Sequence, residues 1–489
     1  MKITHLLSSV LLSLSLTVHV HAEDKPPILE DKIDTYLEYL VTEDFSGSVL
    51  VVHDGEKVIS KGFGLSDRAN RYPNNPNTVF DIMSVTKQFT GAAILKLQMD
   101  NKLKVTDTLA KFFPAMPEDK RDITLHQLLT HTAGLIDLVG GDYDEITQKE
   151  YLQAIYDSKL RFQPGSHYAY ANAGYSLLAM VVEKASGLSY EAYLQKALFK
   201  PAGMKQTGYI LPEFKAMDVA VGYGVSNWGR PNEKPWQTDG PYWHLRGNGG
   251  ILSTTEDMYL WYQALRGEAI LTKDAKAQYF RAEKKPRFRQ NRNSTYAYGW
   301  SIDKAPWDDL IINHTGGNPA MFSDVAFYIN TNSAIIILSN IRDGFSAEVS
   351  REIESIMFVP DHKPAEKKSY RSIGKWLDEG LTAERIINRI KANGPELDKY
   401  MIDDGELNRL GYFYVQNKQL KDALAVFLLN TQRNPNIANT HDSYGETLIA
   451  DGQFQAGVAA YQKALDVDPN YENAEYAREM LAKYGSTDL

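Results

Sequence analysis

The segment Ser84-Val85-Thr86-Lys87 stands at the head of an apolar run that extends from Phe89 to Met99. If that run is helical, residues three apart lie on one face about one turn apart, so the Ser84 hydroxyl and the Lys87 amine can meet. Serine becomes a nucleophile only when a neighbouring group takes its proton, and a lysine can take it only where burial or nearby cations lower its pKa. Ser84 would also lie near a helix N-terminus, whose N–H groups favour negative charge. A motif this short occurs by chance, so it needs partners elsewhere in the chain.

The length and composition of the chain indicate two or three globular units. Its 489 residues are too many for one ordinary domain, and 43% hydrophobic residues suffice for well-packed cores. The formal net charge of −9 argues against a nucleic-acid binder, because such proteins need a basic surface to bind phosphates. There are no cysteines, which excludes disulfides, thiolate metal sites and a lipidated N-terminal cysteine.

The first 22 residues have the pattern of a secretory signal: basic Lys2, an apolar stretch over Leu6–Val20, and Ala22 at the end. We expect cleavage after Ala22 and a periplasmic or secreted mature protein. A membrane anchor is the alternative, but the apolar stretch is shorter than the ~20 residues that a spanning helix needs. We expect no membrane span in the rest of the chain.

The order of helical and extended patterns predicts an α+β fold. A helix is expected over Ile28–Thr42, and a strand over Gly47–His53 meets Asp54-Gly55, a dipeptide typical of β-hairpins. The region from Tyr151 to Leu198 is mostly helical in pattern. Strands return at Tyr296–Ile302, Leu310–His314, Phe322–Ile329 and Ser333–Leu338, before a helix over Ser346–Met357. Distant segments must therefore complete one sheet.

The C-terminal part of the chain has an internal period of 34 residues. Gly411 corresponds to Gly445, and Phe427 corresponds to Tyr461. This period, with small and aromatic positions at matching offsets, resembles the tetratricopeptide repeat, a helical hairpin that stacks on its neighbours. The predicted divisions are a signal peptide over 1–22, a main domain over 23–359, a linker over 360–372 and a helical domain over 373–489, with repeats at about 404–437 and 438–471.

Two later stretches supply chemically suited partners for the serine. The Tyr170 phenol and the Asn172 amide lie two residues apart in an extended or turning segment. Further on, an apolar strand ends in His314-Thr315-Gly316-Gly317, whose glycines leave bare backbone against which a substrate can lie.

The motifs Ser-x-x-Lys, Tyr-x-Asn and His-Thr-Gly, in this order, resemble those of the serine hydrolase family of class C β-lactamases, D-alanyl-D-alanine peptidases and related esterases. The resemblance covers about Ile28 to Phe358 and includes the stretches Leu128–Leu135 and Gly249–Thr254. It implies an α+β fold of the β-lactamase and penicillin-binding-protein type. In that fold an antiparallel sheet carries flanking helices, and the site lies between the sheet and an all-helical lobe.

The resemblance also implies a role for each motif residue. Ser84 would attack a carbonyl and form an acyl-enzyme, while Lys87 and Tyr170 would exchange the proton, with the identity of the base open between them. The backbone N–H groups of Ser84 and Gly317 would form the oxyanion hole. A cation beside Tyr170 would lower the pKa of its phenol and favour tyrosinate. The implied substrate-binding residues are Asn172, which would also hold Lys87, and His314, Thr315 and Gly316.

One position departs from the β-lactamase pattern, because His314 stands where those enzymes carry lysine. Histidine occurs there in peptidases and in many other members that are not lactamases. A lysine is charged at any physiological pH, whereas a histidine with an ordinary pKa of ~6.5 is not. We therefore expect poor β-lactam hydrolysis and an activity that depends on pH through His314.

Other chemically suggestive residues have structural interpretations. His131 is interpreted as a structural residue that hydrogen-bonds its own loop. The residues Trp228, Trp236 and Trp243 either line a substrate cleft or pack a long loop, and both alternatives stay open. No set of His, Asp or Glu residues has the spacing of metal ligands, so no metal and no cofactor is expected.

The leading functional hypothesis is a secreted, metal-independent serine acyl-hydrolase that acts on a D-amino-acid peptide or an ester. One alternative is a carboxylesterase unrelated to peptidoglycan, and another is a non-catalytic, penicillin-binding-like sensor or scaffold that acts through its repeats. The intact set of Ser84, Lys87 and Tyr170 counts against the non-catalytic alternative. Besides a small acyl or peptide substrate, the repeats favour contact with a protein partner or docking on the main domain.

Overall fold

The computed structural model describes residues 28–224, 227–236, 239–281, 295–342, 346–364, 371–471 and 473–485. The predicted signal segment, with its cleavage point after Ala22, lies outside these residues, as does the middle of the predicted linker. No helix in the described ranges combines the length and apolarity that crossing a membrane requires.

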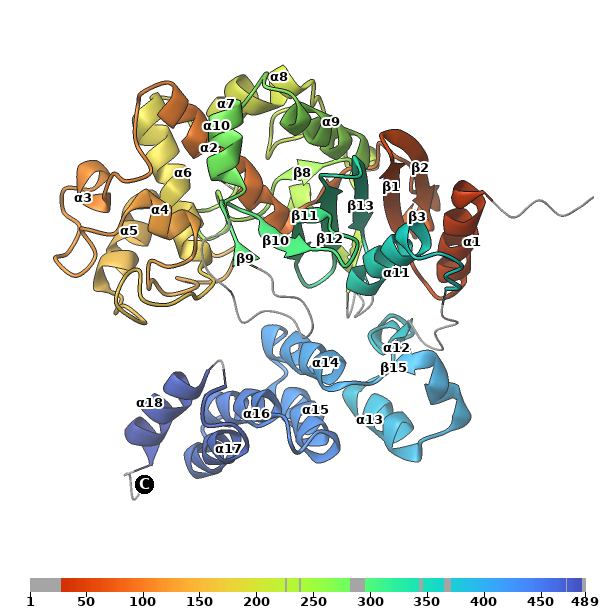
Figure 1. The fold of residues 1–489 in the computed structure, drawn as a ribbon. Coiled ribbons are helices and arrows are strands. Elements are labelled where there is room, and N and C mark those ends of the chain that lie inside the picture. The colour runs from red at the N-terminus through yellow and green to blue at the C-terminus, as the bar shows by residue number, and fades with distance from the viewer. Residues whose placement is uncertain are drawn as a thin grey trace, which may run out of the picture.

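A seven-stranded antiparallel sheet forms the centre of the main domain (Figure 1). Its order is β2-β1-β13-β12-β11-β10-β9, so the early strand β1 lies beside the late strand β13, with Gly47 opposite Ser339. The sheet therefore joins distant segments, as the sequence predicts. The strand bounds are β1 (Gly47–His53), β2 (Glu56–Phe63), β9 (Thr295–Tyr296), β10 (Ser301–Lys304), β11 (Leu310–Gly317), β12 (Phe322–Tyr328) and β13 (Ser333–Ser339).

Both faces of the sheet centre are buried. Alternate residues of a strand point to opposite sides, and each side packs in its own core. Val49 and Val51 of β1 pack in one core with the helices α1 (Leu29–Thr42) and α11 (Ser346–Phe358). The intervening Leu50 belongs to a second core, which holds α9 (Thr255–Arg266). Helices thus cover the sheet on both sides.

The turn between β1 and β2 has the conformation that its sequence predicts. Asp54 and Gly55 have φ values of 50° and 88°, so both lie in the left-handed region. Two-residue hairpin turns of this kind favour Asp-Gly because glycine adopts a positive φ without steric cost.

A helical lobe packs against the second core. Its central helix, α2 (Thr86–Met99), is buried at every position from Thr86 to Leu95, including Lys87. Gly91 is required there, because an added Cβ would lie 2.4 Å from the Tyr298 carbonyl oxygen. The lobe also contains α3 (Leu109–Phe112), α4 (Leu125–Leu129), α5 (Gln148–Asp157), α6 (Asn172–Ser186), α7 (Tyr190–Leu194), α8 (Lys200–Ala202) and α10 (Lys273–Tyr279).

The C-terminal part of the chain is a separate set of helices with its own core (Figure 1). An added Cβ on Gly411 would lie 2.4 Å from the Phe427 ring, and one on Gly445 would lie 3.3 Å from the Tyr461 ring. The same contact thus recurs after one predicted period, which agrees with helix pairs; the tetratricopeptide assignment and the domain limits stay predictions. The helices are α12 (Lys375–Asp378), α13 (Ala383–Ala392), α14 (Asp404–Gln416), α15 (Leu420–Arg433), α16 (Ala438–Ala450), α17 (Phe454–Val467) and α18 (Ala474–Tyr484).

Candidate active site

Ser84 lies on a single 3₁₀ turn, Met83–Val85, immediately before α2. Met83 has a φ of 46°, a left-handed value that is uncommon for a residue with a side chain. Ser84 is partly exposed, whereas every other residue from Phe80 to Phe89 is buried. The tight turn therefore presents one hydroxyl at the surface of a closed core.

The Lys87 amine lies at the centre of three polar contacts. Its Nζ is 3.0 Å from Ser84 Oγ, and it donates to Asn172 Oδ1 and to the Asn248 carbonyl oxygen, each at 2.7 Å. Both oxygens only accept hydrogen bonds. A neutral amine therefore uses its two N–H groups on them and directs its lone pair at the Ser84 hydroxyl.

Burial adjusts the charge of this amine. Lys87 has no exposed surface, and burial lowers its pKa to about 7, although Asp137 and Asp142 raise it. The neutral form is therefore well populated near neutral pH. A lowered pKa is the condition under which Lys87 can act as a base.

Tyr170 also contacts Ser84. Its phenol hydrogen-bonds Ser84, and Lys87 Nζ lies 4.8 Å from the centre of its ring. Burial raises the pKa of Tyr170 above its ordinary value, and the hydrogen bond with Ser84 opposes this only in part. The tyrosinate expected from the sequence is therefore wrong: desolvation outweighs the nearby amine, and the phenol keeps its proton at neutral pH.

The His131 ring packs against the ring of Tyr170. The two ring centres lie 4.2 Å apart, and the Ala171 N–H donates to His131 Nδ1 at 3.1 Å. Burial, together with the nearby Lys87, lowers the pKa of His131 well below its ordinary value, so the ring is neutral. His131 is thus in contact with the Tyr-x-Asn motif as well as being part of its own loop.

Asn172 is the first residue of α6, and Asp137 fixes its orientation. The backbone N–H and the side-chain Nδ2 of Asn172 both donate to Asp137 Oδ1, at 2.8 and 3.0 Å. The amide must then turn its oxygen towards Lys87. Sequence reasoning missed Asp137 and the Asn248 carbonyl, because neither belongs to a motif and both reach the site through the fold.

The strand β11 brings the third motif to the site. His314 is buried, with Nε2 at 3.0 Å from the Tyr296 hydroxyl and Nδ1 at 2.7 Å from the Thr315 carbonyl oxygen. Because that carbonyl can only accept, Nδ1 carries a proton. An added Cβ on Gly316 would lie 2.9 Å from Met83 Cβ, so the glycine lets β11 approach the nucleophile turn.

The comparisons agree with this geometry. The family model described as Beta-lactamase matches residues 37–355. The chain belongs to the β-lactamase family. The predicted family and fold class are confirmed, as is the assignment to a family of serine hydrolases.

Relatives of this β-lactamase-family chain include penicillin-binding proteins. Penicillin-binding protein 4* of Bacillus subtilis (strain 168) is 27% identical over 374 residues, which is 70% of this chain and 81% of that protein. A penicillin-binding protein from Bacillus halodurans has a TM-score of 0.56 at 26% identity, covering 66% of this chain and 98% of that one. D-amino acid amidase from Ochrobactrum anthropi SV3 shares the fold, with a TM-score of 0.57 at 22% identity over 67% and 96% of the two chains.

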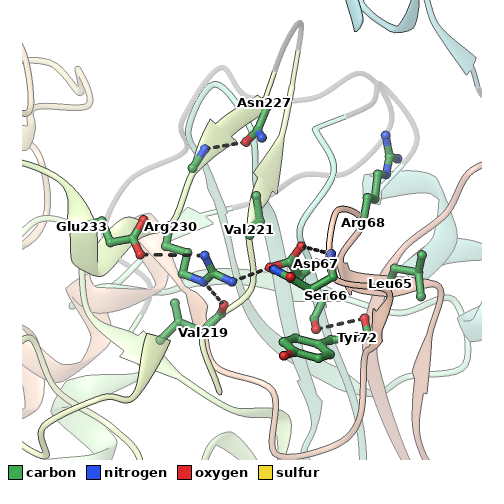
Figure 2. A network of polar contacts seen from close by, with 12 residues as sticks. Leu65, Ser66, Asp67, Arg68, Tyr72, Val219, Val221, Asn227, Arg230 and Glu233 are labelled. Atoms are coloured by element: carbon green, nitrogen blue, oxygen red, sulfur yellow. Dashed lines mark hydrogen bonds and ion pairs between the residues drawn. The ribbon is translucent and has the colours of Figure 1, made fainter. Parts of the chain in front are cut away.

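In this family member the segment that follows Trp228 is anchored by a mostly buried ion pair between Arg230 and Asp67 (Figure 2). Arg230 Nη2 donates to Asp67 Oδ2 at 2.5 Å, and its Nε donates to the Val219 carbonyl oxygen at 3.1 Å. Burial alone would raise the pKa of Asp67, but hydrogen bonds from Asn70 and Arg230 outweigh it and hold the pKa below its usual value. The pair joins the short hairpin of β6 (Gly222–Tyr223) and β7 (Asn227–Gly229) to β3 (Leu65–Asp67).

The three tryptophans have different surroundings. Trp243 is buried, and its ring lies 4.6 Å from the Arg246 guanidinium. Trp236 packs edge-on against Tyr209, and Trp228 lies 5.8 Å from the Tyr143 ring. These contacts favour the loop-packing alternative for Trp243 and leave the cleft alternative open for Trp228. Among the residues with described positions, no group of three or more His, Asp or Glu side chains is arranged to hold a metal ion.

Proposed function

We propose that this chain is an exported serine acyl-hydrolase that forms an acyl-enzyme on Ser84, with a D-amino-acid peptide or a related ester as substrate. The observation that carries the proposal is the buried Lys87 amine, which lies 3.0 Å from the Ser84 hydroxyl and has a pKa lowered to about 7. A buried, partly neutral lysine beside a partly exposed serine is the arrangement that nucleophilic catalysis requires.

The proposed acylation begins with neutral Lys87 taking the proton of Ser84 while the serine oxygen attacks the substrate carbonyl. The negative charge that develops on the carbonyl oxygen is bound by the N–H groups of Ser84 and Gly317. Tyr170, which keeps its own proton, donates it to the leaving amine or alkoxide and recovers one from the Lys87 ammonium. Water then attacks the acyl-enzyme, the same groups move the proton back to Ser84, and the acid product leaves.

The relatives support the D-amino-acid part of the proposal by their names alone, which describe penicillin-binding proteins and a D-amino acid amidase. His314 supports a peptidase or an esterase over an efficient β-lactamase. The class C β-lactamases that this chain resembles carry lysine at that position. The carboxylesterase and sensor alternatives differ from this proposal in what happens after Ser84 reacts.

Intact-protein mass spectrometry tests the proposal. Wild-type protein and Ser84→Ala are treated with a fluorophosphonate and, separately, with a penicillin. We expect one phosphonyl adduct on the wild type and none on the variant, together with a penicillin adduct that persists. Rapid turnover of small esters without a penicillin adduct would favour the carboxylesterase. No adduct from either reagent on the wild type would contradict a hydrolase.

A further inference from the structure

A buried carboxyl group that the proposed reaction does not use lies beneath the nucleophile turn. Asp81 ends the short strand β5 (Phe80–Asp81) and is 2% exposed. Its Oδ1 accepts the Met83 N–H at 2.7 Å, and its Oδ2 accepts Asn318 Nδ2 at 3.2 Å. The same carboxyl group thus contacts the segment before Ser84 and the segment after Gly317.

The orientation of Asn318 is fixed by its other hydrogen bonds. Its Oδ1 accepts the N–H groups of Ala320 and Met321, at 2.9 and 2.8 Å. Those two donors hold the oxygen end of the amide, so the Nδ2 end must face Asp81. The contact between Asp81 and Asn318 therefore has one defined polarity.

Two further contacts hold the same pair of segments together. Ser323 Oγ donates to the Ile82 carbonyl oxygen at 2.9 Å, and Gly316 has no room for a Cβ beside Met83. An Asp81 carboxylate that accepted only the Met83 N–H would be an ordinary turn that any short polar residue can form. The bond to Asn318 is what distinguishes Asp81, because it connects β5 with the segment that follows β11.

We propose that Asp81 is a positioning residue that, through Asn318, sets the separation between the Ser84 and Gly317 N–H groups. The proposal rests on the proposed function, in which these two groups bind the oxyanion. Oxyanion donors act only when both reach the position of the developing charge, and a displacement of about 1 Å can cost ~10²-fold in rate. The carboxylate acts through the backbone and does not touch the substrate.

The charge of Asp81 is set by its surroundings. Burial raises its pKa to about 7, the hydrogen bonds from Met83 and Asn318 oppose this, and the Asp142 carboxylate adds to it. The Tyr143 phenol also faces it and stays protonated. Among the described residues, no cation forms an ion pair with Asp81. The ionised carboxyl group accepts both hydrogen bonds, so the contacts of Asp81 with Met83 and Asn318 are strongest at a pH above 7.

The test exchanges the two side chains. Asp81→Asn turns an Nδ2 donor towards the Asn318 donor, and Asn318→Asp sets two carboxyl groups against each other. The double variant Asp81→Asn/Asn318→Asp restores one donor and one acceptor with reversed polarity. We expect each single variant to label with a fluorophosphonate at saturation about 10–10²-fold more slowly, and the double variant to label within about threefold of the wild type.

Asp67→Asn is the matched control, because Asp67 is also a buried carboxyl group that accepts from an asparagine. It should lower the melting temperature and leave the labelling rate of the folded protein unchanged. Melting temperatures of all variants separate loss of fold from loss of rate. If Asp81→Asn does not fold, Asp81→Ser keeps a short acceptor for the Met83 N–H, removes the bond to Asn318 and should be slowed as much.

The outcomes distinguish the two proposals. A wild type that is not labelled at Ser84 overturns the proposed function, and the positioning role with it. A labelled wild type with single variants that react at the same rate overturns only the positioning role. A double variant as slow as the single ones does the same, because it shows that the paired polarity does not matter.

Discussion

Two buried aspartates of this protein differ in the direction in which the fold shifts their pKa. Asp67 is 3% exposed and Asp81 is 2% exposed, and each accepts a hydrogen bond from an asparagine side chain. Asp67 also contacts the Arg230 guanidinium, and its pKa is lowered; none of the described cations forms an ion pair with Asp81, and its pKa is raised to about 7. Hydrogen bonds from Asn70 and Arg230 together outweigh burial at Asp67, whereas burial outweighs the hydrogen bonds from Met83 and Asn318 at Asp81.

The candidate active site extends this contrast to an amine. Lys87 is fully buried and has a pKa lowered to about 7, and none of the described carboxylates forms an ion pair with it. Arg230 and Asp67 thus form an ion pair that stays charged near neutral pH. Asp81 and Lys87, by contrast, each have a pKa of about 7. Such pKa values suit groups that must move protons.

Removal of the unpaired amine should have the largest effect. Lys87→Met should slow labelling of Ser84 by a fluorophosphonate roughly 10²–10⁴-fold, because the general base is lost. Lys96→Met, on the same helix but paired with Asp100, is the control and should label at the wild-type rate. Equal rates for Lys87→Met and wild type would show that another group takes the proton.

Removal of the paired cation should affect stability instead of rate. Arg230→Met leaves the Asp67 carboxylate buried without a counter-ion and should lower the free energy of unfolding by about 3–5 kcal/mol, measured by urea denaturation. Arg68→Met removes only a contact with the Tyr223 ring and should cost about 1 kcal/mol or less. Arg230→Met/Asp67→Asn should regain part of the loss, and a variant no less stable than wild type would contradict the importance of the pair.

The lowered pKa of Lys87 predicts a pH dependence with a definite sign. The amine must be neutral to accept the Ser84 proton, so the labelling rate should rise about tenfold per pH unit below pH 7 and level off above it. Ionisation of Asp81 acts in the same direction. Labelling at fixed reagent concentration from pH 5 to 9 measures this limb, and a rate that is flat or falls over the interval would be inconsistent with a neutral Lys87 as the base.

His314→Lys should have the smallest effect on rate, because it changes the charge on β11 and the contact with the Tyr296 hydroxyl but leaves Ser84 and Lys87 in place. A lysine stays protonated from pH 5 to 8, whereas an ordinary histidine loses its charge near pH ~6.5. The variant should therefore lose the part of the pH dependence of substrate KM that comes from position 314, by a few-fold at most. An unaltered KM profile between pH 5 and 8 would show that the charge of His314 plays no part.

The predictable parts of this molecule are those that depend on neighbours in sequence. The approach of Ser84 to Lys87 follows from one helical turn, and the Asp54-Gly55 hairpin follows from its two residues. The Arg230 to Asp67 pair spans 163 residues, so no local pattern indicates it. The same holds for Asp81 with Asn318. The tyrosinate prediction for Tyr170 was wrong because the degree of desolvation depends on the packed fold.

The pairing of β1 with β13 bears on how the chain becomes folded. Gly47 lies opposite Ser339, so this strand pair cannot form until almost the whole main domain has left the ribosome. Until then the β1–β2 hairpin carries an edge of unpaired N–H and C=O groups, which invites association with other strands. The late closing of this sheet therefore leaves the early hairpin edge unpaired for most of the synthesis of the main domain.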